Sequence, residues 1–226
     1  MHITVIAKAP VPGRVKTRLC PPCTPQQASD VAAAALADTL DAVAAVAAGV
    51  GMRPTLLLDG DRPDWVSDEY DVVAQCSGDL SARLAHGFAV LGRGVIVGMD
   101  TPAAIRHLPG AVEAVARGDD ALGLAIDGGY WVIGLASVDA QVFAGIEMST
   151  ENTGAQQWRR LRSLGRSVTM LPSARDLDTF DDLVAVACSS GGGRLGIESR
   201  RVVGAARSSG VSGVLVSTSA DSRTMC

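Results

Sequence analysis

Lysine is nearly absent from this sequence. The 226-residue chain has 20 Lys and Arg residues, but only two of them are lysines, Lys8 and Lys16, and both lie near its start. An ammonium is a compact and flexible point charge, whereas a guanidinium is a rigid fork, so the two bind anions differently. This clustering favours an N-terminal loop that needs ammonium groups, with chance survival of two lysines as the alternative.

Other absences limit the function. The net charge of -4 provides no global positive field, so we expect no nucleic-acid partner. No uninterrupted apolar run reaches the length of about 18 residues that a membrane span needs, and the N-terminus does not resemble a signal peptide. The five cysteines are odd in number and unevenly spaced, which favours a reducing compartment over a disulfide scaffold. We therefore expect a cytoplasmic protein without a membrane span.

Short apolar runs alternate with helical patterns along residues 1–188. Strands are predicted at residues 3–7, 55–59, 72–75, 94–98, 121–125, 130–135 and 168–171, and helices at residues 24–48, 80–91, 111–116, 152–164 and 181–187. This alternation predicts one α/β domain, a three-layer α/β/α sandwich with a mainly parallel sheet. In such sheets ligands bind beyond the carboxyl ends of the strands. Lys8, Asp100 and Asp127 each follow a predicted strand.

Residues 189–226 have a different composition. They are rich in Ser, Gly and Arg and show little periodicity, which predicts a mostly disordered tail. Within it, only the apolar stretch at residues 211–217 could form a strand.

A basic loop follows the first predicted strand. Gly13 precedes three cations within five residues, Arg14, Lys16 and Arg18. A loop in this place can direct backbone N–H groups and cations at a diphosphate. The spacing of a Walker A loop is absent, and a solvated basic turn is an equal alternative.

Carboxylates follow two other segments. Asp100 ends an apolar strand, where a carboxylate is costly unless it is paired or holds a metal such as Mg²⁺ or Mn²⁺. A cap of the following helix is its alternative role. Asp176 and Asp178 precede the last predicted helix, where one could reach the site, or both could cap the helix. Asp127 begins an Asp-Gly-Gly segment between two strands, which allows close approach of a ligand or forms a tight turn.

Three patterns resemble known motifs but lack their context. Cys20 and Cys23 have CxxC spacing without a second pair, so redox or zinc roles are disfavoured. Residues 191–196 match GxGxxG, but they follow a helix instead of a strand. His2, His86 and His107 are scattered and are predicted to be incidental.

Six motifs in order resemble one bacterial family. They are AKAP and PGRVKTRL (residues 7–10 and 12–19), GDL with RL (78–80, 83–84), GMDTP (98–102), DGGYW (127–131), MST with TG (148–150, 153–154) and DLDT (176–179). Across residues 1–188 the chain resembles the GT-A-like glycosyltransferases long labelled a domain of unknown function, some of which are assigned to arsenosugar biosynthesis. The resemblance implies the nucleotide-diphospho-sugar transferase fold.

The resemblance also implies roles for individual residues. Lys8, Gly13, Arg14, Lys16, Arg18 and Asp79 would bind the nucleotide and its phosphates. Asp100 takes the place of the metal-binding aspartate, and Asp178, or less favourably Asp176, would be a second metal contact. Asp127 would be catalytic, with Gly128 and Gly129 facing the sugar or acceptor. The chain departs from the family pattern at Ser81, Ala103 and Ala104, and Pro102 stands where a full Asp-x-Asp would have its second carboxylate.

The predicted function is therefore a nucleotide-sugar-dependent glycosyltransferase that uses Mg²⁺ or Mn²⁺ to bridge the donor diphosphate. A nucleotidyltransferase similar to the guanylyltransferases of coenzyme F420 synthesis is the first alternative, and a non-catalytic nucleotide-binding protein is the second. The expected partners are a nucleotide-sugar or a nucleoside triphosphate and a small-molecule acceptor. The sequence predicts no oligomeric state.

Overall fold

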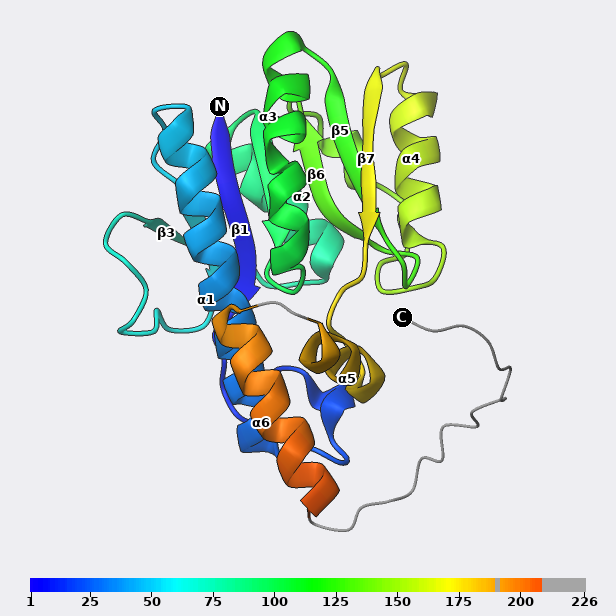
Figure 1. Cartoon of the computed structure of the whole chain (residues 1–226). Helices are drawn as coiled ribbons and strands as arrows, with labels where there is room; N and C mark the ends of the chain where they lie inside the picture. Colours follow the sequence, from blue (N-terminus) through cyan, green and yellow to red (C-terminus); the bar gives the residue numbers. More distant parts are fainter. Residues whose placement is uncertain (190–191, 209–226) are drawn as a thin grey trace, which may run out of the picture.

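A computed structural model describes residues 1–189 and 192–208. Seven strands form one sheet in the order β3-β2-β1-β4-β6-β5-β7, and β6 alone runs antiparallel to its neighbours (Figure 1). The strands are β1 (His2–Lys8), β2 (Thr55–Asp59), β3 (Asp71–Ala74), β4 (Gly94–Gly98), β5 (Asp120–Ala125), β6 (Tyr130–Leu135) and β7 (Val168–Ala174). The predicted mainly parallel sheet is confirmed.

Helices cover both faces of this sheet. They are α1 (Pro25–Gly49), α2 (Leu80–Leu91), α3 (Leu108–Arg117), α4 (Thr153–Ser163), α5 (Phe180–Cys188) and α6 (Arg194–Ser208), with short 3-10 segments η1 (Thr17–Leu19), η2 (Pro102–His107) and η3 (Ala140–Phe143). One core cluster joins α1 and α3 to the sheet, and a second joins α2 and α4 to its other side. The three-layer architecture is therefore also confirmed.

Local sequence explains where α1 begins. The Thr24 side chain accepts a hydrogen bond from the Gln27 backbone, and the Gln27 side chain accepts one from the Thr24 backbone, which forms a capping box. Pro25 occupies the first helical position, where a missing N–H does no harm. The start predicted for this helix is correct.

By length and composition, α1 could cross a membrane, the one helix in the described residues of which this is true. The sequence did not predict this capacity, because polar residues interrupt the apolar run of the helix. Its apolar side chains have a structural explanation, because Val31, Leu36 and Val43 are fully buried in the protein core. Helices that are apolar on most sides occur in the interior of soluble domains as well as in membranes.

The segment after Cys188 differs from the prediction. Residues 194–208 form helix α6 instead of a disordered tail, and Leu195, Val202 and Val203 are buried in a third cluster with α1 and α5 (Figure 1). Asp38 of α1 accepts hydrogen bonds from the backbone N–H groups of Arg194 and Leu195, which fixes the start of α6. The last three residues of the GxGxxG match, 194–196, therefore form the first turn of α6. Residues 190–191 and 209–226, including the stretch at 211–217, lie outside the described residues.

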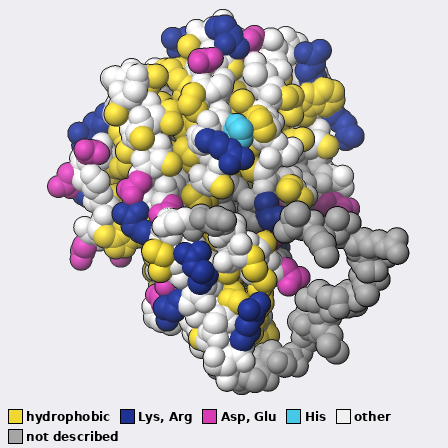
Figure 2. Space-filling model, in the orientation of Figure 1, with side chains coloured by type: hydrophobic (Ala, Val, Ile, Leu, Met, Phe, Trp, Pro, Cys, Tyr) yellow, Lys and Arg dark blue, Asp and Glu magenta, His cyan; other side chains and the backbone are white. Residues whose placement is uncertain are grey.

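Charged side chains are distributed over the surface in small groups. On the face shown in Figure 2, Lys and Arg side chains are separated by apolar patches and by Asp and Glu side chains. Local clusters therefore matter more for anion binding than the field of the whole molecule.

Candidate functional site

The strand order reverses direction next to β1. From β1 the chain adds β2 and β3 on one side, and it then returns to place β4 on the other side. Crevices at such switch points are where open α/β sheets bind ligands. Lys8 is the last residue of β1, and Asp100 follows β4, so the structure brings two predicted site segments to this crevice.

Lys16 connects three separate motifs at the crevice. Its side chain is only 7% exposed, and its Nζ lies 2.7 Å from Asp100 Oδ2. The same ammonium donates a hydrogen bond to the Leu177 carbonyl oxygen. The Leu177 N–H in turn donates to the Asp100 carbonyl oxygen at 3.2 Å. The basic loop, the strand end at Asp100 and the DLDT segment thus meet at one buried ion pair.

The backbone of the basic loop makes this contact feasible. Gly13 has a φ of 78°, and Lys16 has a φ of 48° in the left-handed region. A non-glycine residue in that region is uncommon and is held there by its surroundings. In this conformation the Lys16 side chain contacts both Asp100 and the Leu177 carbonyl oxygen.

Within the described part of the chain, only one of the two carboxylate oxygens of Asp100 has a partner. Oδ2 pairs with Lys16, whereas Oδ1 is buried and has no hydrogen-bond partner among the described residues. Thr101 Oγ1 is also buried and has no hydrogen-bond partner among the described residues. The segment η2 begins after Thr101 without a side-chain cap. The alternative interpretation of Asp100 as a helix cap is therefore wrong.

Arg18 and Asp178 form a second ion pair, at 2.5 Å, on the outside of the crevice. The Arg18 side chain is exposed. The cap of α5 is Thr179, which forms a capping box with Asp182. The alternative in which Asp176 and Asp178 both cap this helix is therefore wrong.

Asp176 lies in an unusual electrostatic environment. Burial, followed by repulsion from Asp127 and Asp178, raises the pKa of Asp176 to about 6, and the charge of Lys16 opposes this shift. The interaction shows that carboxylates from two motifs lie within electrostatic range of each other. Carboxyl groups with raised pKa values are frequent at functional sites, although structural ion-pair networks produce them too.

Packing of the chain explains the glycines after Asp127. The Asp127 carboxylate accepts a hydrogen bond from the Gly129 N–H at 2.8 Å, as in a tight turn. Gly128 has a φ of 92°, and a Cβ there would lie 1.9 Å from the Glu151 carbonyl oxygen. The turn between β5 and β6 thus requires glycine without any ligand. Sugar or acceptor binding by Gly128 and Gly129 stays a prediction, as does a catalytic role for the exposed Asp127.

The Lys8 end of the crevice contains two residues for which the sequence predicted no role. Asp59 ends β2 opposite Lys8, and its carboxylate lies 2.6 Å from the Arg83 guanidinium. Arg83, followed by Lys8 and Arg14, holds the pKa of Asp59 below its usual value. The strand-end rule that singled out Lys8 also applies to Asp59. Lys8 and Arg14 therefore both lie within electrostatic range of Asp59.

Asp79 has a local structural role. Its side chain accepts a hydrogen bond from the Ala82 N–H at 2.9 Å and caps α2. Such a cap contributes about 1 kcal/mol to stability. The predicted contact of Asp79 with the nucleotide stays a prediction.

The CxxC pair lies in a packed loop. Cys23 is buried beside α5 and α6, and burial raises the pKa of its thiol to about 11. A raised pKa opposes formation of the reactive thiolate. The environment of Cys23 is therefore that of a structural thiol.

The carboxylates fit a metal ion only in part. In the portion of the chain that is described, no group of three or more His, Cys, Asp or Glu side chains could hold a metal. Asp100 and Asp178 are instead paired with Lys16 and Arg18. Magnesium often binds through one or two carboxylates, with substrate phosphates as further ligands. The unpartnered Oδ1 of Asp100 therefore fits a cation that binds together with a nucleotide, and not a preformed metal centre.

Two solved structures resemble this fold over nearly its whole length. A candidate nucleotide-diphospho-sugar transferase from Desulfovibrio desulfuricans G20 has 24% sequence identity and a TM-score of 0.79, over 92% of this chain and 98% of that one. A cytidylyltransferase from Leptospira borgpetersenii has 14% identity and a TM-score of 0.51, over 92% and 94% of the two chains. These structures establish a shared fold.

The comparison with curated proteins finds no match. A family model described as "Uncharacterized protein conserved in bacteria (DUF2064)" matches residues 39–150. The matched stretch includes Asp79, Asp100 and the Asp127 turn, and it begins after the basic loop. Residues 39–150 therefore match the DUF2064 family model, and the chain as a whole shares its fold with a candidate nucleotide-diphospho-sugar transferase.

Proposed function

We propose that this protein is a nucleotide-binding transferase, and specifically a glycosyltransferase that takes its donor from a nucleotide-sugar. The observation that carries the proposal is the buried pair between Lys16 Nζ and Asp100 Oδ2, at 2.7 Å, in the crevice beside β1. A buried ammonium and a carboxylate with a free oxygen are suited to bind a phosphate and its counter-ion. The fold of the Desulfovibrio transferase supports the same class of donor.

The proposed donor site uses the cations around this pair. Lys8, Gly13, Arg14 and Arg18 would hold the diphosphate together with Lys16. Asp100 and Asp178 would hold Mg²⁺ or Mn²⁺, which would neutralise charge on the departing nucleoside diphosphate. In the absence of nucleotide, Lys16 and Arg18 balance the charge of these carboxylates. Asp127 is the proposed catalytic carboxylate, facing the sugar or the acceptor.

Nucleotidyl transfer is the second candidate. The likeness to the Leptospira cytidylyltransferase favours it, because the same fold serves that reaction class. An acceptor phosphate would then attack the α-phosphate of a nucleoside triphosphate, and pyrophosphate would leave. Release of pyrophosphate therefore distinguishes this candidate from glycosyl transfer. A cytoplasmic location belongs to either proposal and stays a prediction.

A thermal-shift screen tests the proposal. UDP-, GDP-, dTDP- and CDP-sugars and the nucleoside triphosphates are compared with and without Mn²⁺. A ligand at a hundred times its dissociation constant stabilises the protein by about 2.7 kcal/mol. We expect one nucleotide class to raise the melting temperature, with a larger shift in Mn²⁺.

A pair of variants controls for loss of charge. Lys16→Met should reduce the shift to half or less, whereas Arg117→Gln, which removes an exposed partner of Glu113 on α3, should retain it. Tight nucleotide binding without turnover of any donor would favour a non-catalytic binding protein. Absence of any shift with all nucleotides would contradict the proposal.

A further inference from the structure

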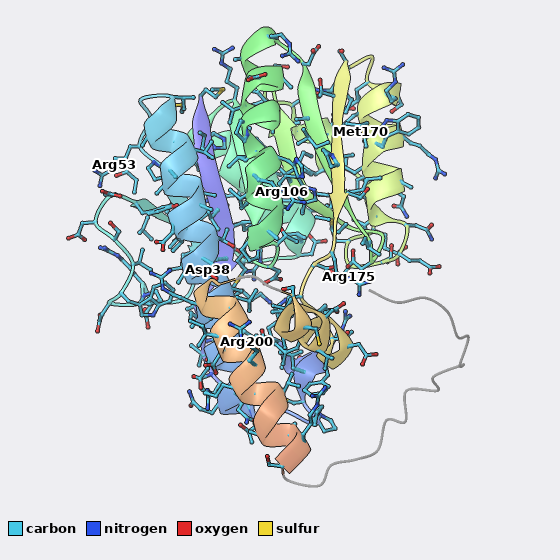
Figure 3. The ribbon with its side chains drawn as sticks, viewed as in Figure 1. Asp38, Arg53, Arg106, Met170, Arg175 and Arg200 are labelled. Atoms are coloured by element: carbon cyan, nitrogen blue, oxygen red, sulfur yellow. The ribbon has the colours of Figure 1, made fainter. Side chains whose placement is uncertain are left out.

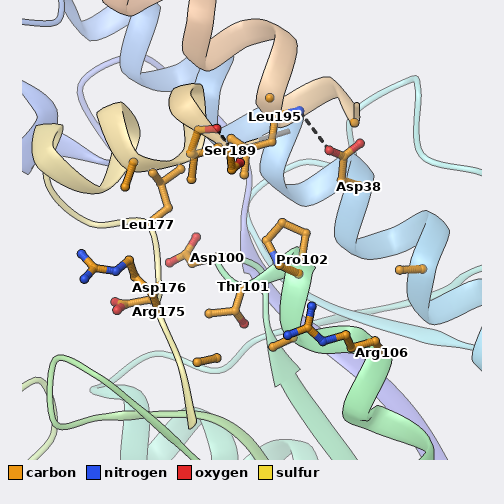
Figure 4. Close-up of a pocket in the computed structure, with 18 of the residues that line it drawn as sticks. Asp38, Asp100, Thr101, Pro102, Arg106, Arg175, Asp176, Leu177, Ser189 and Leu195 are labelled. Carbon is orange, nitrogen blue, oxygen red and sulfur yellow. Dashed lines mark hydrogen bonds between the residues drawn. The ribbon is translucent and has the colours of Figure 1, made fainter. Parts of the chain in front are cut away.

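A pocket of about 780 Å³ has Asp100 in its wall and contains no residue of the basic loop in its lining (Figure 4). It lies between α1, η2, the end of β7, and the helices α5 and α6. Much of its lining is apolar, including Pro102, Ala104, Leu177 and Leu195. Its volume is within the range of about 300–1,000 Å³ that is typical of small-molecule sites.

Unpartnered polar atoms lie in the wall of this pocket. Thr101 lines it and is only 4% exposed, yet its Oγ1 has no hydrogen-bond partner within the described chain. Asp100 lines it as well, and its Oδ1 is also buried without a hydrogen-bond partner among the described residues. A buried polar atom without a partner is unfavourable by about 1–3 kcal/mol. Neighbouring atoms of these kinds are suited to a ligand hydroxyl, which can accept from Thr101 and, when no metal occupies Oδ1, donate to Asp100.

The pocket lining contains the carboxylates Asp38, Asp41, Asp100 and Asp176 as well as the cations Arg106 and Arg175, and these groups differ in how far they are paired. The carboxylates Asp38 and Asp41 are already neutralised by Arg194 and by the first N–H groups of α6. The rim cation Arg175 is paired with Asp182. Arg106, in contrast, is not paired with a carboxylate among the described residues. Its one hydrogen bond to them is donated by Nε to His107 Nε2, at 3.0 Å.

Arg106 therefore has free guanidinium donors at the rim. It belongs to η2, just before α3 (Figure 3), and Figure 4 shows it on the opposite side of the pocket from Arg175. The remaining donors of a guanidinium are suited to a carboxylate or a phosphate.

We infer that this pocket binds the acceptor, a small molecule with an apolar body, a hydroxyl against Thr101 and Asp100, and an anionic group at Arg106. The inference rests on the proposed transferase function. Lys8, Arg14, Lys16 and Arg18 do not line the pocket, so it is separate from the proposed phosphate site. Asp100 belongs to both, because it pairs with Lys16 and also forms part of the pocket wall. The acceptor hydroxyl would thus lie next to the donor.

Three fluorescent naphthalenes test each recognition element. The probe 6-hydroxy-2-naphthoate carries both polar groups, 2-naphthoate lacks the hydroxyl, and 2-naphthol lacks the carboxylate. We expect one molecule of 6-hydroxy-2-naphthoate to bind per chain, and each simpler probe to bind about tenfold more weakly, as expected for one hydrogen bond to a charged or buried group. Failure of all three to bind at millimolar concentration would overturn the inference.

Matched variants locate the binding. Arg106→Gln should remove the advantage of the carboxylate and leave 2-naphthol unchanged. Thr101→Val keeps the side-chain shape and should remove much of the advantage of the hydroxyl. Ala185→Trp fills the pocket from an exposed position of α5 and should block every probe, whereas Cys188→Trp, at an exposed position of α5 outside the lining, should not. Equal binding to wild type and to Ala185→Trp would overturn the inference.

A final binding experiment distinguishes failure of this inference from failure of the proposed function. Probe binding is measured with and without the nucleotide that gives the largest thermal shift. Simultaneous binding supports an acceptor pocket, and competition between the two would overturn it, because the pocket would then be the nucleotide site. If the probes bind as expected but no nucleotide does, the proposed function fails, and the pocket retains its ligand class without the acceptor role.

Discussion

Buried carboxylates at the two ends of the parallel strands differ in how completely they are hydrogen-bonded. Here, an edge of the sheet means the end at which the parallel strands begin or the end at which they finish. At the edge where the parallel strands begin, Asp120 is 2% exposed, and both of its oxygens are hydrogen-bonded to Arg166. One oxygen also accepts from the Ala136 N–H at 2.9 Å. At the edge where they end, Asp100 has one oxygen paired with Lys16 and the other without a partner.

The partners of the two carboxylates differ as well. The Arg166 guanidinium is a fixed fork that matches a carboxylate at two points, and it also donates to the Ser137 carbonyl oxygen at 2.6 Å. Lys16 is a point charge on a flexible stem. The first pair is saturated and serves the fold, whereas the second is left open, as expected of a pair that exchanges one partner for a ligand.

The largest effect on stability should come from breaking the saturated pair. Removing one partner of a buried ion pair leaves the other charge uncompensated and typically destabilises a protein by about 3–5 kcal/mol. Asp120→Ala should therefore lower the melting temperature by roughly 6–20 °C, since 1 kcal/mol corresponds to about 2–4 °C for a chain of this size. Glu113→Gln, which breaks an exposed pair with Arg117, should change it little. Equal shifts for the two variants would show that Asp120 is not a structural anchor.

A second polar group at the starting edge predicts a pH dependence. His2 is hydrogen-bonded to the Gly92 carbonyl oxygen and to Thr4, and burial lowers its pKa to about 4. Between pH 6.5 and 4 the unfolded chain therefore binds more protons than the folded one. The stability that neutral His2 contributes is present above pH 6.5 and is lost as the pH falls through 4, by roughly 3 kcal/mol.

Chemical unfolding of wild type and His2→Gln at several pH values measures this contribution. The difference in unfolding free energy between the two proteins should shrink as the solution is acidified. A difference that stays constant from pH 7 to pH 4 would contradict the assignment of a neutral, buried His2.

At the open edge the expected effects are on ligand binding. Lys16→Ala should weaken nucleotide binding with and without metal alike, by about ten- to a hundredfold, because a charge-assisted contact contributes about 1.5–3 kcal/mol. Lys16→Arg should restore only part of the affinity, because the fork has a different geometry. Calorimetric titration measures each affinity. Unchanged binding by Lys16→Ala would remove this lysine from the proposed phosphate site.

Much of the fold was predictable because local signals and the final structure agree. Apolar runs bounded by turn residues located all seven strands, and Thr24 with Pro25 located the start of α1. Helix α6 was missed because its apolar positions lie among several arginines and because Asp38, far away in the sequence, caps it. Its stability depends on long-range contacts that no local pattern contains.

The placement of the candidate residues was predictable in part, whereas their roles stay predictions. The rule that ligands bind at strand ends identified Lys8 and Asp100, and the structure brings both to the crevice beside β1. It could not indicate which cation pairs with which carboxylate, because that depends on how the basic loop folds back. The pocket beside Asp100 was also beyond sequence reasoning, since Arg106 and Thr101 become neighbours of α5 and α6 only through packing.

The central claim is that Asp100 is an open carboxylate for a metal that binds with the nucleotide. Asp100→Asn retains the shape of the side chain and removes the charge that a hard cation needs. The decisive measurement is a titration of wild type and Asp100→Asn with the best nucleotide, in Mn²⁺ and in chelator. Wild type should bind more tightly in Mn²⁺, whereas Asp100→Asn should bind weakly and equally in both. A full metal response in Asp100→Asn would contradict the claim and reduce the Lys16–Asp100 pair to a structural contact.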